Sequence, residues 1–454
     1  MVSDNRERGG MTEENEAYLR IEQVFKEIYS GQIKLAAQQA GDSKSWTRQR
    51  KMPLHDILLC TMAKKGLTTV MELRHYFNEI GKAGQMVSKQ DYLRQRQKLN
   101  PEVFKQLNEN YLRRFYSGQE AKVWRGYVVL AIDGSKVEIP NSAENRQAYG
   151  QSENQHRKAG ARADCSVMHD VFNGFMLDVG VHSCQGNEIS EAKLNIEALA
   201  PILGERPVLV LFDRNYVSLE FMDILEKKGI KYLMRLRSSD YKAEAAGMQG
   251  TDGEVELVHT KNRLRTLRRE SPERHRELVE RGSSSVRMVR AVFKDEQWGI
   301  LLTNLREESA GDIQRLYRKR WAIEQQYHTM KNKMKFESVT GKASIYVKQD
   351  FWAQALVFNI IQDLIIKAEY EAAKKVRKKP LRYEIRVNQN IAIGLFKEQF
   401  IKLMLEEDGG RKSALFICLI AEMERHIVPV RKLKTTERRW SLSNKYKCNQ
   451  KPAF

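Results

Sequence analysis

The amino-acid sequence predicts a mixed α/β fold, with helices on both faces of a sheet and helical regions on either side of it in the chain. Two continuous apolar runs, residues 127–132 and 207–212, are typical of strands buried on both faces. Three leading strands are followed by alternating helices and strands, which is the order expected of a mixed sheet. A long amphipathic helix is predicted from Ser309, whose side chain caps it, to about Lys335.

Composition indicates a soluble globular protein. The chain has 454 residues, of which 41% are hydrophobic and 30% charged. We find no run of about 20 apolar residues that would span a bilayer, and no apolar segment typical of a secretory signal. We therefore expect a cytoplasmic protein with no membrane partner. The five cysteines are scattered, which favours neither a disulfide framework nor a thiolate zinc site.

The strong positive charge predicts a polyanionic partner. Lysine and arginine number 78 against 58 acidic residues, giving a formal net charge of +20. Binding to a polyanion is favoured because each neutralised phosphate releases condensed counterions. Charge alone does not separate DNA from RNA or from an anionic membrane, and a basic protein without a nucleic-acid role stays possible at this point.

The region before the sheet has the pattern of a bundle of short helices. Apolar residues recur at helical spacing over residues 54–62, Gly66 ends that helix, and Thr69 begins the next. Ser88 is a plausible N-cap of another helix, in which several basic residues follow. This pattern suits DNA docking, but it fits a plain helical interaction domain equally well.

The sheet region contains three further strands and two helices that the sequence predicts. The strands are expected over residues 162–170, 175–181 and 230–236, and the helices over 189–199 and 218–228. The charged residues 237–298, with short alternating segments, are typical of a β-rich insertion, after which residues 300–305 return to the buried-strand pattern.

These patterns divide the chain into six parts. We expect a mobile tail over 1–20, a helical domain suited to DNA binding over 21–120, a first part of the α/β core over 121–236, the β-rich insertion over 237–298, a second part of the core with the long helix over 299–372, and a helical, basic region over 373–454.

Two carboxylates follow the two most buried strands. Asp133 comes directly after the run 127–132, and Asp213 directly after 207–212. The carboxyl ends of neighbouring parallel strands meet at one edge of a sheet, where open α/β folds build their sites. One such aspartate is often only a turn residue. Two of them in neighbouring strands favour a functional site.

The long helix supplies a third carboxylate. Tyr317, Arg320, Glu324 and Lys331 fall within a stripe of about 60° on its surface. The apolar residues of the helix lie beside this stripe, so packing them on the sheet brings Glu324 toward the strand ends. The alternative is an ordinary amphipathic helix in which Arg320 and Glu324 form an i,i+4 pair.

The spacing Y-x2-R-x3-E-x6-K resembles the signature of DDE transposases of bacterial insertion sequences, in particular the insertion-sequence-four family. The segments DGSK after the first buried strand, FDRNY after the second and LLTNL before the long helix resemble the same family. The resemblance extends from about Val87 to Lys447, and the order of the motifs makes it specific. It implies an RNase H-like core interrupted by a β insertion.

The resemblance also implies the chemistry. Asp133, Asp213 and Glu324 are expected to hold two Mg²⁺ ions, with Mn²⁺ as a substitute, because carboxylates are the ligands that such hard cations prefer. The expected reaction is cut-and-paste transposition: cleavage at the terminal inverted repeats of an element, then strand transfer into target DNA. A homodimer in the synaptic complex and association with the nucleoid follow from the same resemblance.

Further residues are candidates for DNA contacts, each with a plainer alternative. The resemblance assigns Tyr317, Arg320 and Lys331 to phosphates, although Tyr317 equally fits the core with its hydroxyl bonded internally. Trp298 is a candidate for stacking a flipped base, and the role of Trp321 is left open. The alternative for both is burial in the core, which is more common for a tryptophan. The basic residues after a polar loop contact DNA backbone or form a solvated face; they are His156, Arg157, Lys158 and Arg162.

Two other functions share these features. An RNase H-fold nuclease would use the same carboxylates without strand transfer, and a vestigial DDE protein would bind DNA without cutting it. All three carboxylates are present with an intact signature helix, which argues against loss of catalysis.

Overall fold

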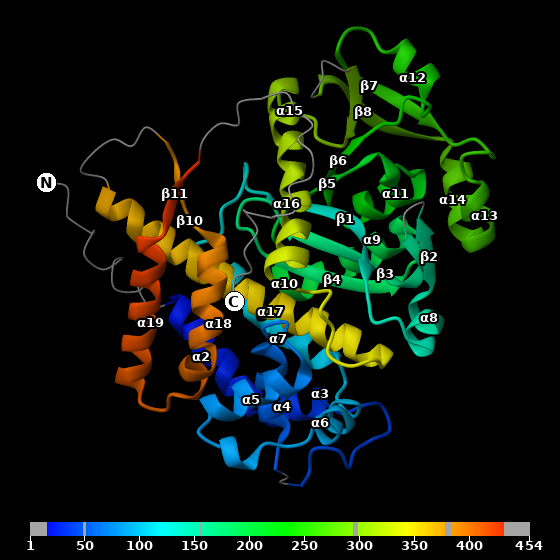
Figure 1. Cartoon of the computed structure of the whole chain (residues 1–454). Coiled ribbons are helices and arrows are strands. Elements are labelled where there is room, and N and C mark those ends of the chain that lie inside the picture. The colour runs from blue at the N-terminus through cyan, green and yellow to red at the C-terminus, as the bar shows by residue number, and fades with distance from the viewer. Residues whose placement is uncertain (1–15, 49–50, 155–156, 294–297, 377–382, 431–454) are drawn as a thin grey trace, which may run out of the picture. The chain divides into compact units, whose positions relative to one another are not determined.

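The computed structural model describes residues 16–48, 51–154, 157–293, 298–376 and 383–430 (Figure 1). The chain forms two compact units. A helical unit comprises Met1–Phe115, Glu138–Arg162 and His328–Phe454, and a sheet unit comprises Tyr116–Val137 and Ala163–Tyr327. The chain therefore passes from one unit to the other within strands β1 (Val128–Glu138) and β3 (Arg157–Asp170).

A mixed sheet is the framework of the sheet unit, and the mixed α/β prediction is confirmed. In the described residues it has nine strands, in the order β2-β3-β1-β5-β6-β9-β8-β7, with β4 paired to β3. Besides β1 and β3, the strands are β2 (Gln151–Asn154), β4 (Met176–Ser183), β5 (Val208–Phe212), β6 (Lys231–Arg235), β7 (Asp252–Val258), β8 (Ser283–Val292) and β9 (Trp298–Thr303).

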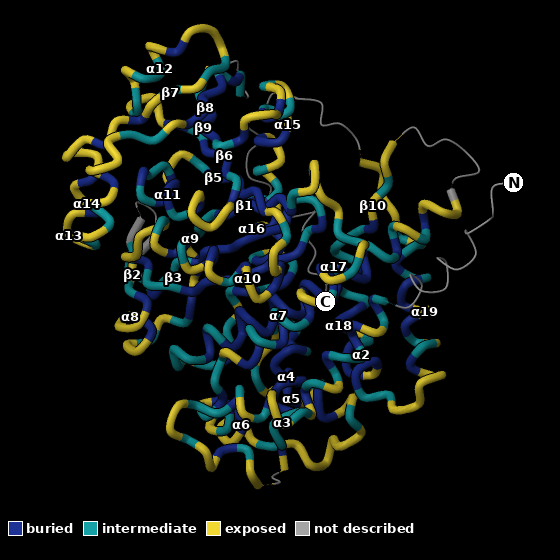
Figure 2. Tube along the Cα trace, turned by 180° about the vertical axis from the view of Figure 1, so that it is seen from behind, coloured by how far each residue is buried: buried dark blue, intermediate teal, exposed yellow. Residues whose placement is uncertain are grey.

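The two apolar runs form the centre of this sheet. β1 pairs in parallel with β5, from Val128 opposite Val208 to Ala131 opposite Leu211. All five residues of β5 are buried, as are the first five of β1, and both segments are dark in Figure 2. β6 continues the parallel set, whereas β9 lies antiparallel to it. Burial on both faces explains why these strands are apolar at every position rather than at alternate ones.

The insertion differs from the β-rich segment that the sequence predicts. It contributes β7 and β8 to the same sheet, where β8 lies antiparallel to β9, but it also contains three helices. These are α12 (Lys242–Gly247), α13 (Arg265–Glu270) and α14 (Pro272–Arg281). α13 and α14 each bury one leucine, Leu267 and Leu278 respectively, so neither carries the apolar periodicity from which a helix is predicted.

An arginine of the insertion also holds the segment that leads into the signature helix. Arg287, on β8, makes a bidentate pair with Asp252 of β7. Its guanidinium also donates to the backbone carbonyl of Glu308 at 2.8 Å. Since Ser309 follows directly as the N-cap, the insertion fixes the start of this helix.

The long helix predicted from Ser309 is not continuous. The predicted cap is confirmed, because the Ser309 side chain accepts a hydrogen bond from the amide of Asp312. The chain then forms α15 (Ala310–Arg318), a 3₁₀ turn η4 (Lys319–Trp321), α16 (Ala322–His328) and a π-helical turn η5 (Thr329–Lys333). The spacing of a regular helix therefore holds only approximately across this segment, and Lys331 lies in the π-helical turn.

Shorter helices complete the sheet unit. They are the 3₁₀ turn η2 (Arg214–Tyr216) and helices α9 (Glu188–Glu197), α10 (Leu199–Leu203) and α11 (Leu219–Lys227).

The helical unit is built around α17 (Ser344–Val376). Its other helices are α2 (Glu16–Ile28), α3 (Gly31–Ala36), α4 (Leu54–Met62), α5 (Thr69–Glu79), η1 (Ala83–Gln85), α6 (Lys89–Arg96), α7 (Glu102–Ser117, which ends in the sheet unit), α8 (Ala143–Tyr149), α18 (Gln389–Leu405) and α19 (Gly409–Arg425), and it has one small ladder, β10 (Ile385–Val387) with β11 (Ile427–Pro429). The predicted cap Ser88 is confirmed by its bond to the Asp91 amide.

The boundaries of the units differ from the predicted domains. Residues 138–162 and 328–372 were expected in the catalytic core, but they group with the N-terminal helices. The contacts explain this: the Tyr149 hydroxyl donates to the Ser344 carbonyl, and the Ser142 hydroxyl to the Lys342 carbonyl. These bonds join α8 to the segment that leads into α17.

Buried charges tie α17 to the N-terminal helices. Asp350 pairs with Lys64 at 2.8 Å and with Arg96 at 2.7 Å, and Asp363 pairs with Arg20. In the described part of the chain, α17 is long and apolar enough to cross a membrane, contrary to the prediction that no segment is. Of its apolar stretch 83% is buried inside the protein, as in a core helix.

Lys397 of α18 is buried beside this network. Its ammonium nitrogen lies 2.6 Å from the Lys64 carbonyl and 2.9 Å from Oε1 of Gln354, and it donates to both. Burial lowers the pKa of Lys397 to about 7, and the charge of Lys64 contributes to the decrease. The folded protein therefore releases a proton that the unfolded chain keeps up to its ordinary pKa near 10.4.

We predict that Lys397→Met changes how stability depends on pH. Because the unfolded chain binds more protons between about pH 7 and 10, this lysine makes wild-type stability rise with pH there, by at most about 1.4 kcal/mol per unit. The free energy of unfolding of Lys397→Met, measured relative to that of wild type, should therefore fall by up to that amount for each unit of pH. Urea unfolding between pH 7.5 and 9.5, about a two-unit window, measures it. Lys402→Met, at an exposed position of α18, is the control, and parallel curves for Lys397→Met and wild type would contradict the prediction.

Candidate active site

The two predicted aspartates lie at the same end of the paired strands β1 and β5. The parallel ladder ends at Ala131 opposite Leu211, and each aspartate comes two residues later in its strand. Asp213 directly follows β5 and is the N-cap of η2. Asp133 differs from the expectation, since β1 continues to Glu138 and Asp133 lies within the strand. Asp133 nevertheless sits where β1 loses its partner β5, so its side chain is only partly covered.

Two tyrosines attach the signature helix to these strand ends. The Tyr317 hydroxyl donates to the carbonyl of Phe212, the residue before Asp213, at 3.3 Å. The Tyr327 hydroxyl lies 2.6 Å from the carbonyl of Asp133 itself and 2.7 Å from that of Cys165, and its one hydrogen is shared between these two acceptors. The bonds lie on either side of Arg320 and Glu324, so they hold this part of the helix over the aspartates.

Arg320 joins the helix carboxylate to the first aspartate. One guanidinium nitrogen lies 3.0 Å from Oε1 of Glu324, and the other lies 3.6 Å from Oδ2 of Asp133. The i,i+4 pair considered in the sequence is therefore present, but the arginine also faces the strand end. Burial lowers the pKa of Arg320, but the neighbouring Tyr317, Asp213 and Asp133 raise it more, so the side chain stays cationic.

Asp133 is held in an environment that disfavours its charge. Burial raises the pKa of Asp133 to about 6. Arg320 and the amide of Gly134, which donates to Oδ1 at 2.9 Å, oppose this rise, whereas the carboxylates of Asp213 and Glu188 add to it. A bound cation would relieve this repulsion, which is a property expected of a metal ligand.

The donor set fits hard divalent cations. The groups that face this end of the sheet are carboxylate oxygens, which Mg²⁺ and Mn²⁺ prefer, whereas thiolates and imidazoles would indicate softer metals. In the described part of the chain, no three His, Cys, Asp or Glu side chains converge closely enough to hold an ion as they stand. Arg320, between Asp133 and Glu324, occupies the space where these two carboxylates would converge.

The other predicted residues are placed as follows. Tyr317 is buried, at 6% exposure, with its hydroxyl bonded internally, whereas Trp298 and Trp321 are 70% and 49% exposed. Lys331 belongs to the helical unit. Arg162 faces Glu138 at 3.7 Å. The side chains of Arg157 and Lys158 and the whole of His156 lie outside the described residues. DNA contacts by these residues stay predictions.

Three functional candidates were missed in the sequence. Glu188 of α9 and Tyr216 of η2 both approach Gly134, the residue after Asp133, and Glu191 follows Glu188 along α9. Tyr216 belongs to the FDRNY motif, and Glu188 opens a helix after the N-cap Asn187, so both carried a local signal. Their proximity to Asp133 arises only in the folded sheet.

A family model described as "Transposase DDE domain" matches residues 124–360, slightly more than half of the chain. The chain belongs to the DDE transposase family. The transposase is 22% identical over 331 residues to the transposase InsG of insertion sequence element IS4 from Escherichia coli (strain K12), covering 70% of this chain and 71% of that protein. These matches confirm the resemblance to the insertion-sequence-four family and the expected enzyme class, which cleaves and joins DNA.

Among solved structures, the transposase is similar to the piggyBac transposase in its synaptic complex with hairpin DNA, determined by cryo-EM. The TM-score is 0.41 at 10% identity, over 89% of this chain and 80% of that one. At this score the likeness carries no argument for the geometry of the site.

We predict that Asp133→Asn makes the metal-free transposase more stable at pH 7.5. A carboxyl whose pKa is raised in the folded state contributes stability that is present at low pH and lost as pH rises through about 6. The asparagine avoids this loss, so we expect a gain of about 1–3 kcal/mol at pH 7.5 that disappears near pH 4. Thermal unfolding in EDTA across this pH range measures it. A gain of equal size at pH 4 would show that removing the charge is not the cause.

Proposed function

We propose that the transposase cuts the terminal inverted repeats of a mobile element and joins them to target DNA by a cut-and-paste route, with Asp133, Asp213 and Glu324 as its catalytic carboxylates. The observation that carries this assignment is the attachment of the signature helix to the ends of β1 and β5 through Tyr317 and Tyr327. It holds the helix that bears Glu324 over the two strand-end aspartates.

We propose Mg²⁺ as the metal, in two copies, with Mn²⁺ as a substitute. Bound divalent ions supply an activated oxygen nucleophile and stabilise the charge on the attacking and leaving oxygens. The chain's own part would be to present the carboxylate oxygens of Asp133, Asp213 and Glu324 as ligands of the ions. Since Asp133 has a raised pKa, protons compete with cations for it below about pH 6.

Arg320 has a second role in this proposal. Its guanidinium bonds Glu324 and faces Asp133, so it neutralises part of the carboxylate charge. With divalent cations bound at these carboxylates, Arg320 would be free to bind a phosphate in a bidentate manner. Trp298 is a second candidate for contact with the DNA end, because it is largely exposed at the start of β9 and offers a face for base stacking.

The decisive test is cleavage of DNA that carries the element's own ends, with Mg²⁺, by wild type and by Glu324→Gln. We expect the variant to lose cleavage by at least about 10³-fold while it binds the ends as well as wild type. Glu307→Gln, at an exposed position before the signature helix, is the matched control and should cleave normally.

Other outcomes identify the alternatives. Tight binding of ends without cleavage by wild type would indicate a vestigial enzyme, and cleavage without strand transfer would indicate a nuclease. We further propose that two copies act together on paired ends in the cytoplasm, at the nucleoid. Light scattering of the same reaction mixtures would refute this if it found one copy per paired end.

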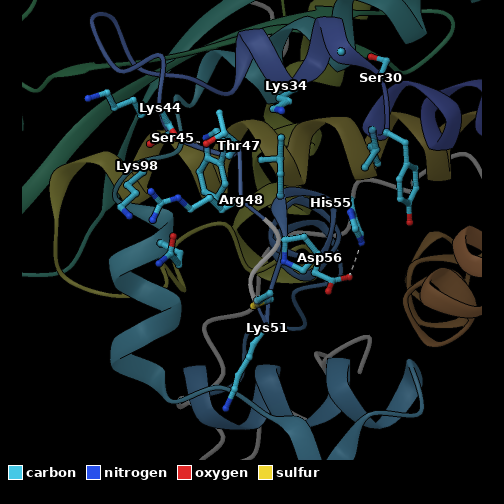
Figure 3. A pocket seen from close by; sticks show the side chains of 18 of the residues that line it. Ser30, Lys34, Lys44, Ser45, Thr47, Arg48, Lys51, His55, Asp56 and Lys98 are labelled. Atoms are coloured by element: carbon cyan, nitrogen blue, oxygen red, sulfur yellow. Dashed lines mark hydrogen bonds and ion pairs between the residues drawn. The ribbon is translucent and has the colours of Figure 1, made fainter.

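The helical unit contains a pocket that supports the proposed DNA-binding role of residues 21–120. The pocket has a volume of about 1020 Å³ and is lined by six lysine and arginine side chains against two aspartates. Figure 3 shows Lys34, Arg48 and Lys98 around it, and places Asp56 beside His55. Asp56 accepts a hydrogen bond from the Tyr76 hydroxyl, and Asp42 accepts one from Ser45, so both acids already have partners. The excess of cations in one hollow suits a DNA backbone.

We predict that Lys34→Ala and Lys98→Ala weaken DNA binding about equally for all sequences. Each lost phosphate contact should reduce the slope of log affinity against log salt by about 0.9. Filter binding or fluorescence anisotropy at several salt concentrations measures both effects. Lys402→Ala, an exposed lysine of α18 outside the pocket, controls for net charge. An equal loss in the control would show that charge alone, and not the pocket, is responsible.

A further inference from the structure

A fourth carboxylate lies beside the strand-end aspartates. Glu188 is the first residue of α9, a helix capped by Asn187 that packs against β4 and η2. Its Cγ lies 3.8 Å from the position that a Cβ would take at Gly134, the residue after Asp133. Glu188 and Asp213 are the two acids whose charge adds to the raised pKa of Asp133. Glu188 therefore belongs to the same acidic group, although it comes from a different element.

A buried hydroxyl points into this group. Tyr216 is 1% exposed, and its hydroxyl has no hydrogen-bond partner among the described residues. The hydroxyl lies 3.9 Å from the same Cβ position at Gly134 that Glu188 approaches. A buried hydroxyl without a partner destabilises the fold, which a structural tyrosine would avoid by bonding to a nearby carbonyl. Its position favours a role toward a ligand.

Glu191 lies behind Glu188, about one turn further along α9. Its side chain is 4% exposed, and Oε1 has no partner among the residues described. This oxygen lies 2.6 Å from the Cβ position of Gly186, so the absence of a side chain there leaves space for the carboxylate. Two buried oxygens that lack partners, those of Tyr216 and Glu191, thus accompany Glu188.

The two oxygens of Asp133 face different groups. Oδ2 faces Arg320, which bonds Glu324, whereas Oδ1 accepts the amide hydrogen of Gly134. Arg320 thus links Glu324 to Oδ2 of Asp133, whereas Glu188 lies near Gly134. Glu188 therefore offers a further carboxylate on the Gly134 side of Asp133.

We propose that Glu188 is a fourth carboxylate ligand of the divalent cations, together with Asp133, and that the Tyr216 hydroxyl, which has no partner among the described residues, gains one when the cations bind. This inference rests on the proposed function of the same site, and it adds a residue outside the three-carboxylate signature. The competing role for Glu188 is structural: a carboxylate in the first turn of α9 stabilises the helix through its dipole. That role affects stability but leaves cation binding unchanged.

The test is calorimetric titration of the DNA-free, full-length transposase with Mn²⁺. We expect Glu188→Gln to weaken Mn²⁺ binding by at least about tenfold or to remove one bound ion, and Glu188→Asp to restore part of the affinity. Tyr216→Phe should weaken binding severalfold. The control is Glu197→Gln, at the other end of α9, where the carboxylate is exposed and pairs with Lys228. It should bind Mn²⁺ as wild type does. Thermal unfolding without metal checks that each variant is folded.

The outcomes separate this inference from the proposed function. If Asp133→Asn loses Mn²⁺ binding while Glu188→Gln keeps wild-type affinity and stoichiometry, the inference is overturned and the catalytic assignment stands. If wild type binds Mn²⁺ through Glu188 but does not cut the element's ends, the inference stands and the proposed function fails. A loss of stability in Glu188→Gln without a change in Mn²⁺ binding would assign Glu188 to the helix end.

Discussion

The active site depends on the attachment of one helix to two strand ends. Neither α15 nor α16 exceeds nine residues, and the 3₁₀ turn η4 interrupts the regular α-helical hydrogen bonding between them. The hydroxyls of Tyr317 and Tyr327 hold this segment in place, because they donate to the backbone carbonyls of Phe212 and Asp133 at the ends of β5 and of the β1–β5 ladder. Carbonyls that belong to a buried sheet are rigid acceptors, so they also limit the movement of the side chains between the two tyrosines.

The electrostatics of the site follow from its position at the mouth of a buried sheet. Partial burial makes the ionised form of Asp133 costly, and the surrounding carboxylates increase that cost. Arg320 offsets part of it, so the same side chain that is expected to bind phosphate also helps to stabilise the protein without metal. Arg320 and Asp133 therefore affect both the proposed activity and the stability, and an arrangement that favours one can oppose the other, as is common in sites with perturbed pKa values.

The sequence predicted those elements that depend on interactions between residues close together in the chain. The apolar runs predicted the two central strands, because burial on both faces makes every position of a strand apolar. Ser309 and Asp312 predicted the start of the signature helix, because a helix cap is formed by residues three positions apart. The helices α13 and α14 escaped prediction because each buries a single leucine. Glu188 and Tyr216 escaped it because their approach to Asp133 depends on how α9 and η2 pack, which no spacing along the chain records. The break at η4 has no sequence signal that we can identify.

The insertion shares the sheet of the catalytic core. β8 supplies the hydrogen bonds of one edge of β9, and Arg287 reaches from β8 to the carbonyl before the cap of the signature helix. An engineer who trimmed residues 237–292 to obtain a minimal nuclease would expose a strand edge with buried apolar residues, which invites aggregation, and would release the helix that carries Glu324. During evolution, shortening this segment therefore requires a replacement strand, whereas lengthening it at the β7 edge does not.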